Sequence, residues 1–101
     1  MAYAEQYETV AAGTGPQTMG SASAGAGDLL LGVLIVPAST SPGAVTIKDG
    51  GDSAITIFAG GASSLTSLAP FFVPVYAKSR TGAWQITTGS NVSAIGVGTF
   101  G

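Results

Sequence analysis

Residues 44–58 read AVTIKDGGDSAITIF and carry the clearest strand pattern in the chain. Apolar and polar side chains alternate over residues 45–48 and again over residues 55–57, which is the period of two expected for a half-buried strand. Between these runs lies the sequence DGGD at residues 49–52. Glycine accepts the positive φ angles of a tight turn without steric cost. We therefore predict a β-hairpin over residues 44–58.

Three other segments have the composition of strands. Residues 29–37 form a continuous apolar run that ends at Pro37, and such a run is typical of a buried strand. Residues 84–88 and 92–100 follow later in the chain and are separated by a Gly-Ser-Asn turn. Short strands at this spacing are typical of a β-sandwich.

The segment from residue 68 to residue 76 contains two prolines, Pro70 and Pro74. Proline cannot donate a hydrogen bond to a sheet ladder, so it is rare in central strands. We therefore predict that residues 68–76 form an edge strand or a bulged strand.

The first 28 residues differ from the rest of the chain. A strand-like piece at residues 6–12 is followed by a Gly/Ser/Ala-rich segment, residues 13–27, with almost no large side chain to bury. We predict an extended N-terminal arm over residues 1–28 and a β-sandwich domain over residues 29–101. The expected fold class is all-β: a single small antiparallel β-sandwich of the jelly-roll or Ig-like type.

Charged and metal-binding side chains are scarce. The chain has three Lys and Arg residues, five Asp and Glu residues, no Cys and no His. Three basic residues are too few to neutralise a nucleic-acid backbone, so we expect no nucleic-acid partner. Without Cys or His there is no thiolate nucleophile and no Ser/His pair, and the usual transition-metal ligands are missing. We expect no enzymatic activity and no bound metal.

The longest apolar run, residues 29–37, is much shorter than the roughly 20 residues of a membrane-crossing helix. The N-terminal residues lack the basic and apolar regions of an export signal. We expect synthesis in the cytoplasm and no association with a membrane. Only 8% of the residues are charged, against about 25% in an ordinary soluble domain. Such a surface is typical of a subunit that packs against other protein.

Two motifs have a chemical and a structural interpretation. Residues 96–101 match G-x-G-x-x-G, but no helix follows to bind a pyrophosphate, so we interpret them as a final strand and expect no cofactor. Asp49 and Asp52 flank a Gly-Gly pair, yet the other oxygen ligands of a calcium loop are missing. Hydrogen bonding of the Asp side chains to turn backbone is the favoured interpretation, and Asp28 is expected to end the arm.

Lys78, Arg80 and Trp84 form the one basic and aromatic cluster of the sequence. Arg80 stacked on Trp84 would make a platform for a sugar or a base. The favoured interpretation places Trp84 in the core, with Ile86 on the same face of the strand.

Five segments carry a family resemblance: GAVTIKDG (residues 43–50), GAWQITTG (82–89), VSAIGVGTF (92–100), TVAA (9–12) and GAGD (25–28). In these segments the chain resembles the small structural proteins of tailed bacteriophage and prophage virions. The resemblance implies a β-sandwich and a structural role, and it brings no catalytic residue with it.

Among such virion proteins, head decoration or cement proteins suit a small, charge-poor single domain best. The resemblance therefore implies a place on the capsid surface, bridging copies of the major capsid protein. Self-association as a homotrimer or another oligomer is also expected. The interaction residues expected from the arm and from the proline-containing edge are Gln6, Tyr7, Glu8, Thr9, Val10, Phe71, Phe72, Val73 and Tyr76.

A second hypothesis is a tail, fibre or spike component that binds a host glycan through Trp84 and Tyr76. Glycan sites place aromatic faces beside several hydrogen-bonding side chains. The chain has one Trp, three Tyr and one Asn, so few of its side chains are of the kinds that bind a glycan.

Overall fold

A computed structural model describes residues 6–21 and 24–101, and these residues form eight β-strands and no helix. The strands are β1 (Gln6–Val10), β2 (Gln17–Thr18), β3 (Leu29–Pro37), β4 (Val45–Asp49), β5 (Ile55–Phe58), β6 (Phe71–Lys78), β7 (Trp84–Thr88) and β8 (Val92–Thr99).

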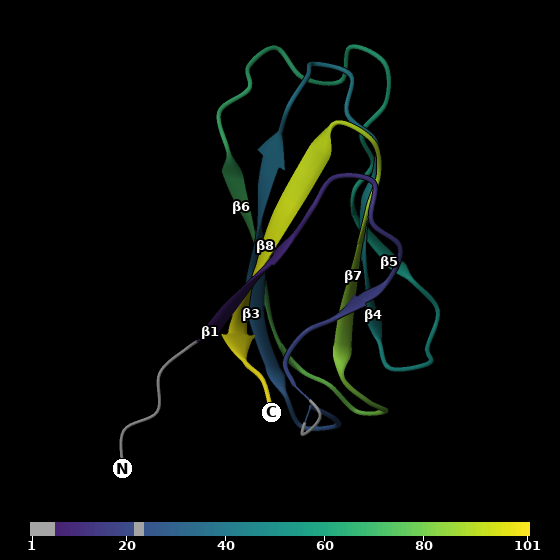
Figure 1. Ribbon diagram of the computed structural model, residues 1–101, viewed down its shortest axis with the longest axis vertical. Helices are drawn as coiled ribbons and strands as arrows, with labels where there is room; N and C mark the ends of the chain where they lie inside the picture. The colour runs from purple at the N-terminus through teal and green to yellow at the C-terminus, as the bar shows by residue number, and fades with distance from the viewer. Residues whose placement is uncertain (1–5, 22–23) are drawn as a thin grey trace.

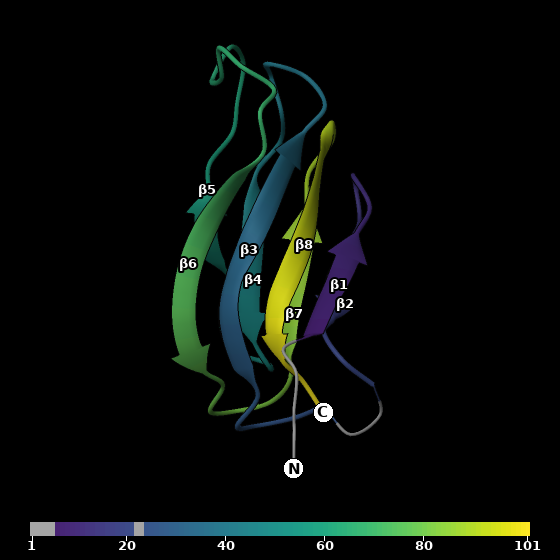
Figure 2. The ribbon, with the colours of Figure 1, turned by 90° about the vertical axis from the view of Figure 1, so that its left-hand side faces the viewer.

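The strands form two antiparallel sheets that pack face to face (Figures 1 and 2). Sheet A has the strand order β1-β8-β3-β6, and sheet B has the order β2-β7-β4-β5. Along the chain, each strand lies in the opposite sheet from the one before it, except that β4 and β5 are neighbours in sheet B. Two four-stranded sheets connected in this way make a jelly roll. The predicted all-β sandwich is confirmed, and its connectivity is of the jelly-roll type.

The local predictions for the body of the sandwich are confirmed. The hairpin over residues 44–58 consists of β4 and β5, with Ile47 opposite Ile55. Strand β3 spans residues 29–37 and lies between β8 and β6, with one side buried in the core and the other side partly exposed. Within the described residues, β6 pairs with β3 alone, so it is the edge strand that Pro74 predicts. It runs over residues 71–78 in place of the predicted 68–76, and Pro70 lies in the loop before it.

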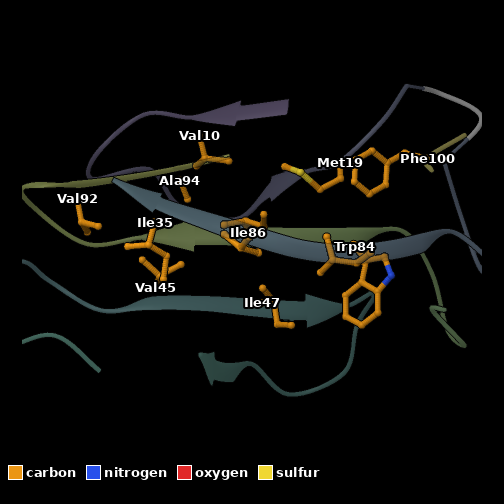
Figure 3. Packing of buried hydrophobic residues seen from close by; sticks show 12 residues of the cluster. Val10, Met19, Ile35, Val45, Ile47, Trp84, Ile86, Val92, Ala94 and Phe100 are labelled. Carbon is orange, nitrogen blue, oxygen red and sulfur yellow. The ribbon is translucent and has the colours of Figure 1, made fainter. Parts of the chain in front are cut away.

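The inward faces of the two sheets form one apolar core (Figure 3). Its members are at most 6% exposed: Val10, Met19, Leu30, Val33, Ile35, Val45, Ile47, Trp84, Ile86, Val92, Ala94 and Phe100. Gly96 lies in β8 against this core, and a Cβ atom there would come within 2.7 Å of the Met19 sulfur. Residues 96–99 are thus strand, and Gly96 leaves the space that Met19 fills.

Residues 6–10 and 17–18, which the sequence places in an arm, are strands of the two sheets. β1 pairs with β8 at the edge of sheet A, and β2 pairs with β7 at the edge of sheet B. Val10 and Met19 are completely buried. The sandwich therefore begins before residue 29, because two large side chains suffice to anchor a segment made mostly of small ones. Residues 1–5 of the predicted arm lie outside the described residues.

Candidate interaction surface

The outer face of sheet A is apolar. Side chains alternate between the two faces of a sheet, so outward residues of neighbouring strands form rows across it. In the strand register Thr9, Ile95, Leu34 and Phe72 make one row, and Tyr7, Val97, Gly32 and Pro74 make the next. We call these eight residues and Tyr76 the apolar face. None of them is charged, and Tyr7, Phe72 and Tyr76 are 73%, 45% and 70% exposed.

Phe72 lies across Gly32 on this face. A Cβ atom at Gly32 would collide with the Phe72 ring and would come within 2.6 Å of the Val73 carbonyl oxygen. Gly32 therefore allows the ring to lie against the backbone of β3. One side of the ring is packed there, and its other side remains exposed.

Tyr76 is presented by a β-bulge. Val75 and Tyr76 of β6 lie opposite the single residue Leu31 of β3, and the pairing of the two strands is irregular at this point. The φ angle of Tyr76 is 51°, in the left-handed region that bulky side chains avoid. Such a conformation costs about 1–2 kcal/mol. The fold thus holds an exposed aromatic ring at the margin of the apolar face despite a backbone penalty.

Strand alternation divides the interaction residues expected from the sequence into two groups. Tyr7, Thr9, Phe72 and Tyr76 lie on the apolar face, whereas Gln6, Glu8, Val10, Phe71 and Val73 point into the sandwich. The inward group is available to a partner only at the margins of the sheets. Leu34 was missed because residues 29–37 were expected to form a buried strand. Ile95 and Val97 were missed because nothing in the sequence showed which side of the final strand faces outward.

The inward polar residues of β1 hold the margin of the sandwich together. The Glu8 carboxylate accepts hydrogen bonds from the Gly20 backbone N–H, at 2.9 Å, and from the Gln17 side-chain amide, at 3.1 Å. The Gln6 side-chain oxygen accepts a hydrogen bond of 2.6 Å from the Phe100 backbone N–H. These hydrogen bonds stabilise the fold at this margin.

Charged residues gather at one end of the sandwich. The structure describes seven of the eight charged residues, since Glu5 lies outside the described ranges. Six of the seven lie in or beside the β2–β3, β4–β5 and β6–β7 connections, at the lower end in Figure 1. They are Asp28, Lys48, Asp49, Asp52, Lys78 and Arg80. The six charges sum to zero, and the seventh charged residue is Glu8.

The opposite end, which we call the uncharged end, consists of four loops. They are residues 11–16, 38–44, 59–70 and 89–91, and they contain no charged residue.

Hydrogen bonds join the loops of the uncharged end to one another. The Gly61 N–H donates to the Pro42 carbonyl oxygen at 2.7 Å, and the Leu65 N–H donates to the Thr40 carbonyl oxygen at 3.1 Å. Farther along this end, the Gly13 N–H donates to Gly89 at 2.8 Å. The loops therefore form a connected surface.

At the charged end, Asp49 binds the β6–β7 loop. Its carboxylate accepts hydrogen bonds from the backbone N–H groups of Arg80 at 2.8 Å, Thr81 at 3.1 Å and Gly82 at 3.3 Å. The Thr81 hydroxyl donates to it as well, at 3.1 Å. Desolvation raises the pKa of Asp49, but these hydrogen bonds outweigh it and bring the pKa below 3.8. The sequence favoured hydrogen bonding of the Asp49 side chain to turn backbone, and the backbone that it binds belongs to the distant β6–β7 loop.

Asp49→Asn is expected to lower the free energy of unfolding at pH 7 by about 1–3 kcal/mol, because it weakens charge-assisted hydrogen bonds. The folded-state pKa lies below the ordinary value of 3.8. The contribution of the carboxylate is therefore complete well above pH 3.8 and is lost as the pH falls through the folded-state pKa. Thermal unfolding of both proteins between pH 2 and about pH 7 measures this, with the exposed Asp52→Asn as control. A stability difference that does not shrink in acid would contradict it.

Trp84 is a core residue, as the sequence favoured. It is 4% exposed, and its indole N–H donates a hydrogen bond of 3.0 Å to the Asp28 carbonyl oxygen. Arg80 is exposed and cannot use the buried ring as a platform. Tyr76 lies on the outer side of sheet A, so the two aromatic residues of the glycan hypothesis do not share a surface.

Other candidate sites offer less. A pocket of about 480 Å³ at the charged end is lined by one acidic residue, Asp28, and one basic residue, Lys78, and favours neither sign of charge. In residues 6–21 and 24–101, no group of three or more His, Cys, Asp or Glu residues could hold a metal ion. The same residues form no helix long and apolar enough to cross a membrane.

Compared with known proteins, the chain matches no family model, no curated protein and no solved structure.

Proposed function

We propose that this protein is a non-enzymatic structural subunit of a tailed-bacteriophage particle. Its role is that of a decoration protein that binds the outside of the head shell and stabilises contacts between major capsid subunits. The observation that supports this most is the separation of charge. Six charged residues lie at one end of the sandwich, while the uncharged end and the apolar face carry none.

This separation suits a subunit that stands on a protein surface. Burying an unpaired charge in an interface costs several kcal/mol, whereas burying hydroxyls and backbone groups that find hydrogen-bond partners costs little. The uncharged end can therefore face the shell while the charged end remains in water. Its loops are joined by hydrogen bonds, so less conformational entropy is lost on binding.

The fold and the sequence agree with this proposal. Jelly rolls occur in viral capsid domains, in lectins and in cupins, so the fold alone does not choose among these roles. The resemblance of the sequence to virion structural proteins favours the first. Weak attachment of each copy is sufficient, because interactions repeated over a lattice of shell subunits give avidity.

The number of copies per particle tests the proposal. Particles are purified from cells that carry the encoding phage or prophage, and this chain is counted against the major capsid protein by quantitative mass spectrometry. Hundreds of copies per particle are expected. A handful of copies confined to the tail would overturn the head role and favour the tail or fibre hypothesis.

A charge placed on the uncharged end tests the mode of attachment. Leu68 is 48% exposed in the 59–70 loop, so Leu68→Asp should preserve the fold. We expect about tenfold fewer copies retained on the particle, because the new carboxylate must be desolvated on attachment. The matched control is Ile55→Asp, at a position that is 52% exposed near the charged end. Equal retention of the two variants would contradict attachment through the uncharged end.

A further inference from the structure

We infer that the apolar face of sheet A binds a second copy of this chain in a two-fold symmetric dimer, with Tyr76 as an anchor of the interface. This goes beyond the proposed function, which requires attachment to the shell and does not require copies to bind each other. The inference rests on the size of the face, its residues and the backbone conformation at Tyr76.

The outer face of sheet A, which contains the apolar face, approaches the size of a small dimer interface. The five residues of β1, nine of β3, eight of β6 and eight of β8, at about 3.4 Å per residue and about 4.8 Å between strands, cover a footprint of roughly 500 Å². Projecting rings raise the accessible area above this value, and Tyr7 and Tyr76 are 73% and 70% exposed. Stable interfaces bury about 600–1,000 Å² on each partner. With its projecting rings, the outer face of sheet A therefore comes near the lower end of that range.

The chemistry of the face favours a copy of itself. A two-fold interface brings each patch against the same patch of the partner. A charged side chain near its centre would therefore lie close to the identical charge of the other copy and be repelled by it. The apolar face carries no charge, and Lys78 lies beyond it at the lower end of β6. Its centre is aliphatic, from Leu34, Ile95 and Val97, and its margins are aromatic. Aromatic residues, tyrosine among them, are enriched at protein interfaces relative to the rest of the protein surface.

The face is a better docking element than the free edge of β6. Pro74 has no backbone N–H to offer an added strand, and the bulge at Val75 and Tyr76 interrupts the edge. The same bulge presents the Tyr76 ring, at a φ of 51° that glycine or asparagine adopts more readily. A strained residue that is also exposed contributes little to the fold, and an interface accounts for its presence.

The test is the molar mass of the purified full chain in solution, measured by light scattering and by sedimentation over a range of concentrations. The wild-type chain is expected at about twice its 9.8 kDa at micromolar concentrations. Tyr76→Gly and Tyr76→Asn should weaken the dimer at least about 30-fold, the effect of losing an interface anchor. Both residues tolerate the left-handed conformation, so both variants should remain folded by circular dichroism. Ile55→Thr, an equally uncharged change at an exposed position in sheet B, should leave the dimer intact.

Three results would overturn the inference: a wild-type chain that stays monomeric at about 100 μM, a trimer in place of the dimer, or folded Tyr76 variants that dimerise like the wild type. These measurements use no phage particles. If the chain proves monomeric in solution, the number of copies on the particle still tests the proposed function. If few copies are found on the particle, the dimer in solution is not affected by that result.

Discussion

Deletion of residues 2–20 is expected to leave no folded protein. The deletion removes β1 and β2, and with them the buried side chains of Val10 and Met19, each of which contributes about 1.5–3 kcal/mol by burial. It also exposes the edges of β8 and β7, which these strands cover. Together, the lost burial and the lost strand pairing are comparable with the roughly 5–15 kcal/mol free energy of unfolding of a whole domain. Far-UV circular dichroism with thermal melting should show no cooperative transition.

Two point variants of the N-terminal segment make this expectation quantitative. Met19→Ala should lower the free energy of unfolding by about 2–5 kcal/mol, because it opens a cavity between the sheets. Thr9→Ala changes an exposed side chain of β1 and should stay within about 0.5 kcal/mol of the wild type. If the truncated chain melts cooperatively with wild-type stability, residues 6–18 are a dispensable arm despite their pairing.

Trp84→Ala is expected to lower the free energy of unfolding by about 3–5 kcal/mol, the usual cost of emptying a buried aromatic site. The side chain is 4% exposed and lies at the charged end of the core (Figure 3). Its backbone carbonyl accepts a hydrogen bond of 2.8 Å from the Met19 N–H, and it lies opposite Asp49 of β4, so the residue connects β7 with both neighbouring segments. Urea unfolding of the wild type and the variant measures the change.

Trp84→Phe separates the packing of the ring from its hydrogen bond. Phenylalanine keeps an apolar ring but cannot donate to the Asp28 carbonyl oxygen, so we expect a smaller loss of about 1–2 kcal/mol. Soluble Trp84→Ala protein with wild-type stability would show that the ring is not needed by the fold. Loss of glycan binding in that folded variant would favour the tail or fibre hypothesis.

The body of the fold was predictable because its signals are local. Alternation over residues 45–48 and 55–57, with two glycines between them, specifies a hairpin whatever lies around it. The uninterrupted run at residues 29–37 indicates a buried strand, and Pro74 indicates an edge. Each of these patterns reflects a backbone preference or a burial period within one short segment.

The candidate surface was only partly predictable. The sequence pointed to Tyr7, Thr9, Phe72 and Tyr76, which do lie on the apolar face. It could not separate them from their neighbours Glu8, Phe71 and Val73. Both faces of β6 are apolar, and the side chains of β1 do not show which side of that strand faces the core. Which residues face outward depends on register, and a shift of one residue exchanges the two faces.

The amino-acid order of this protein determined its strands, its hairpin and its class, since these follow from alternation, glycine turns and proline edges within a few residues. The tertiary structure decided three further features: the membership of β1 and β2 in the sheets, the binding of Asp49 to residues 80–82, and the separation of the apolar face from the charged end. Each depends on contacts between distant residues, such as the hydrogen bond from Phe100 to Gln6, 94 positions apart. Such contacts form because burying apolar surface brings the two sheets together, and no local preference encodes which distant groups then meet.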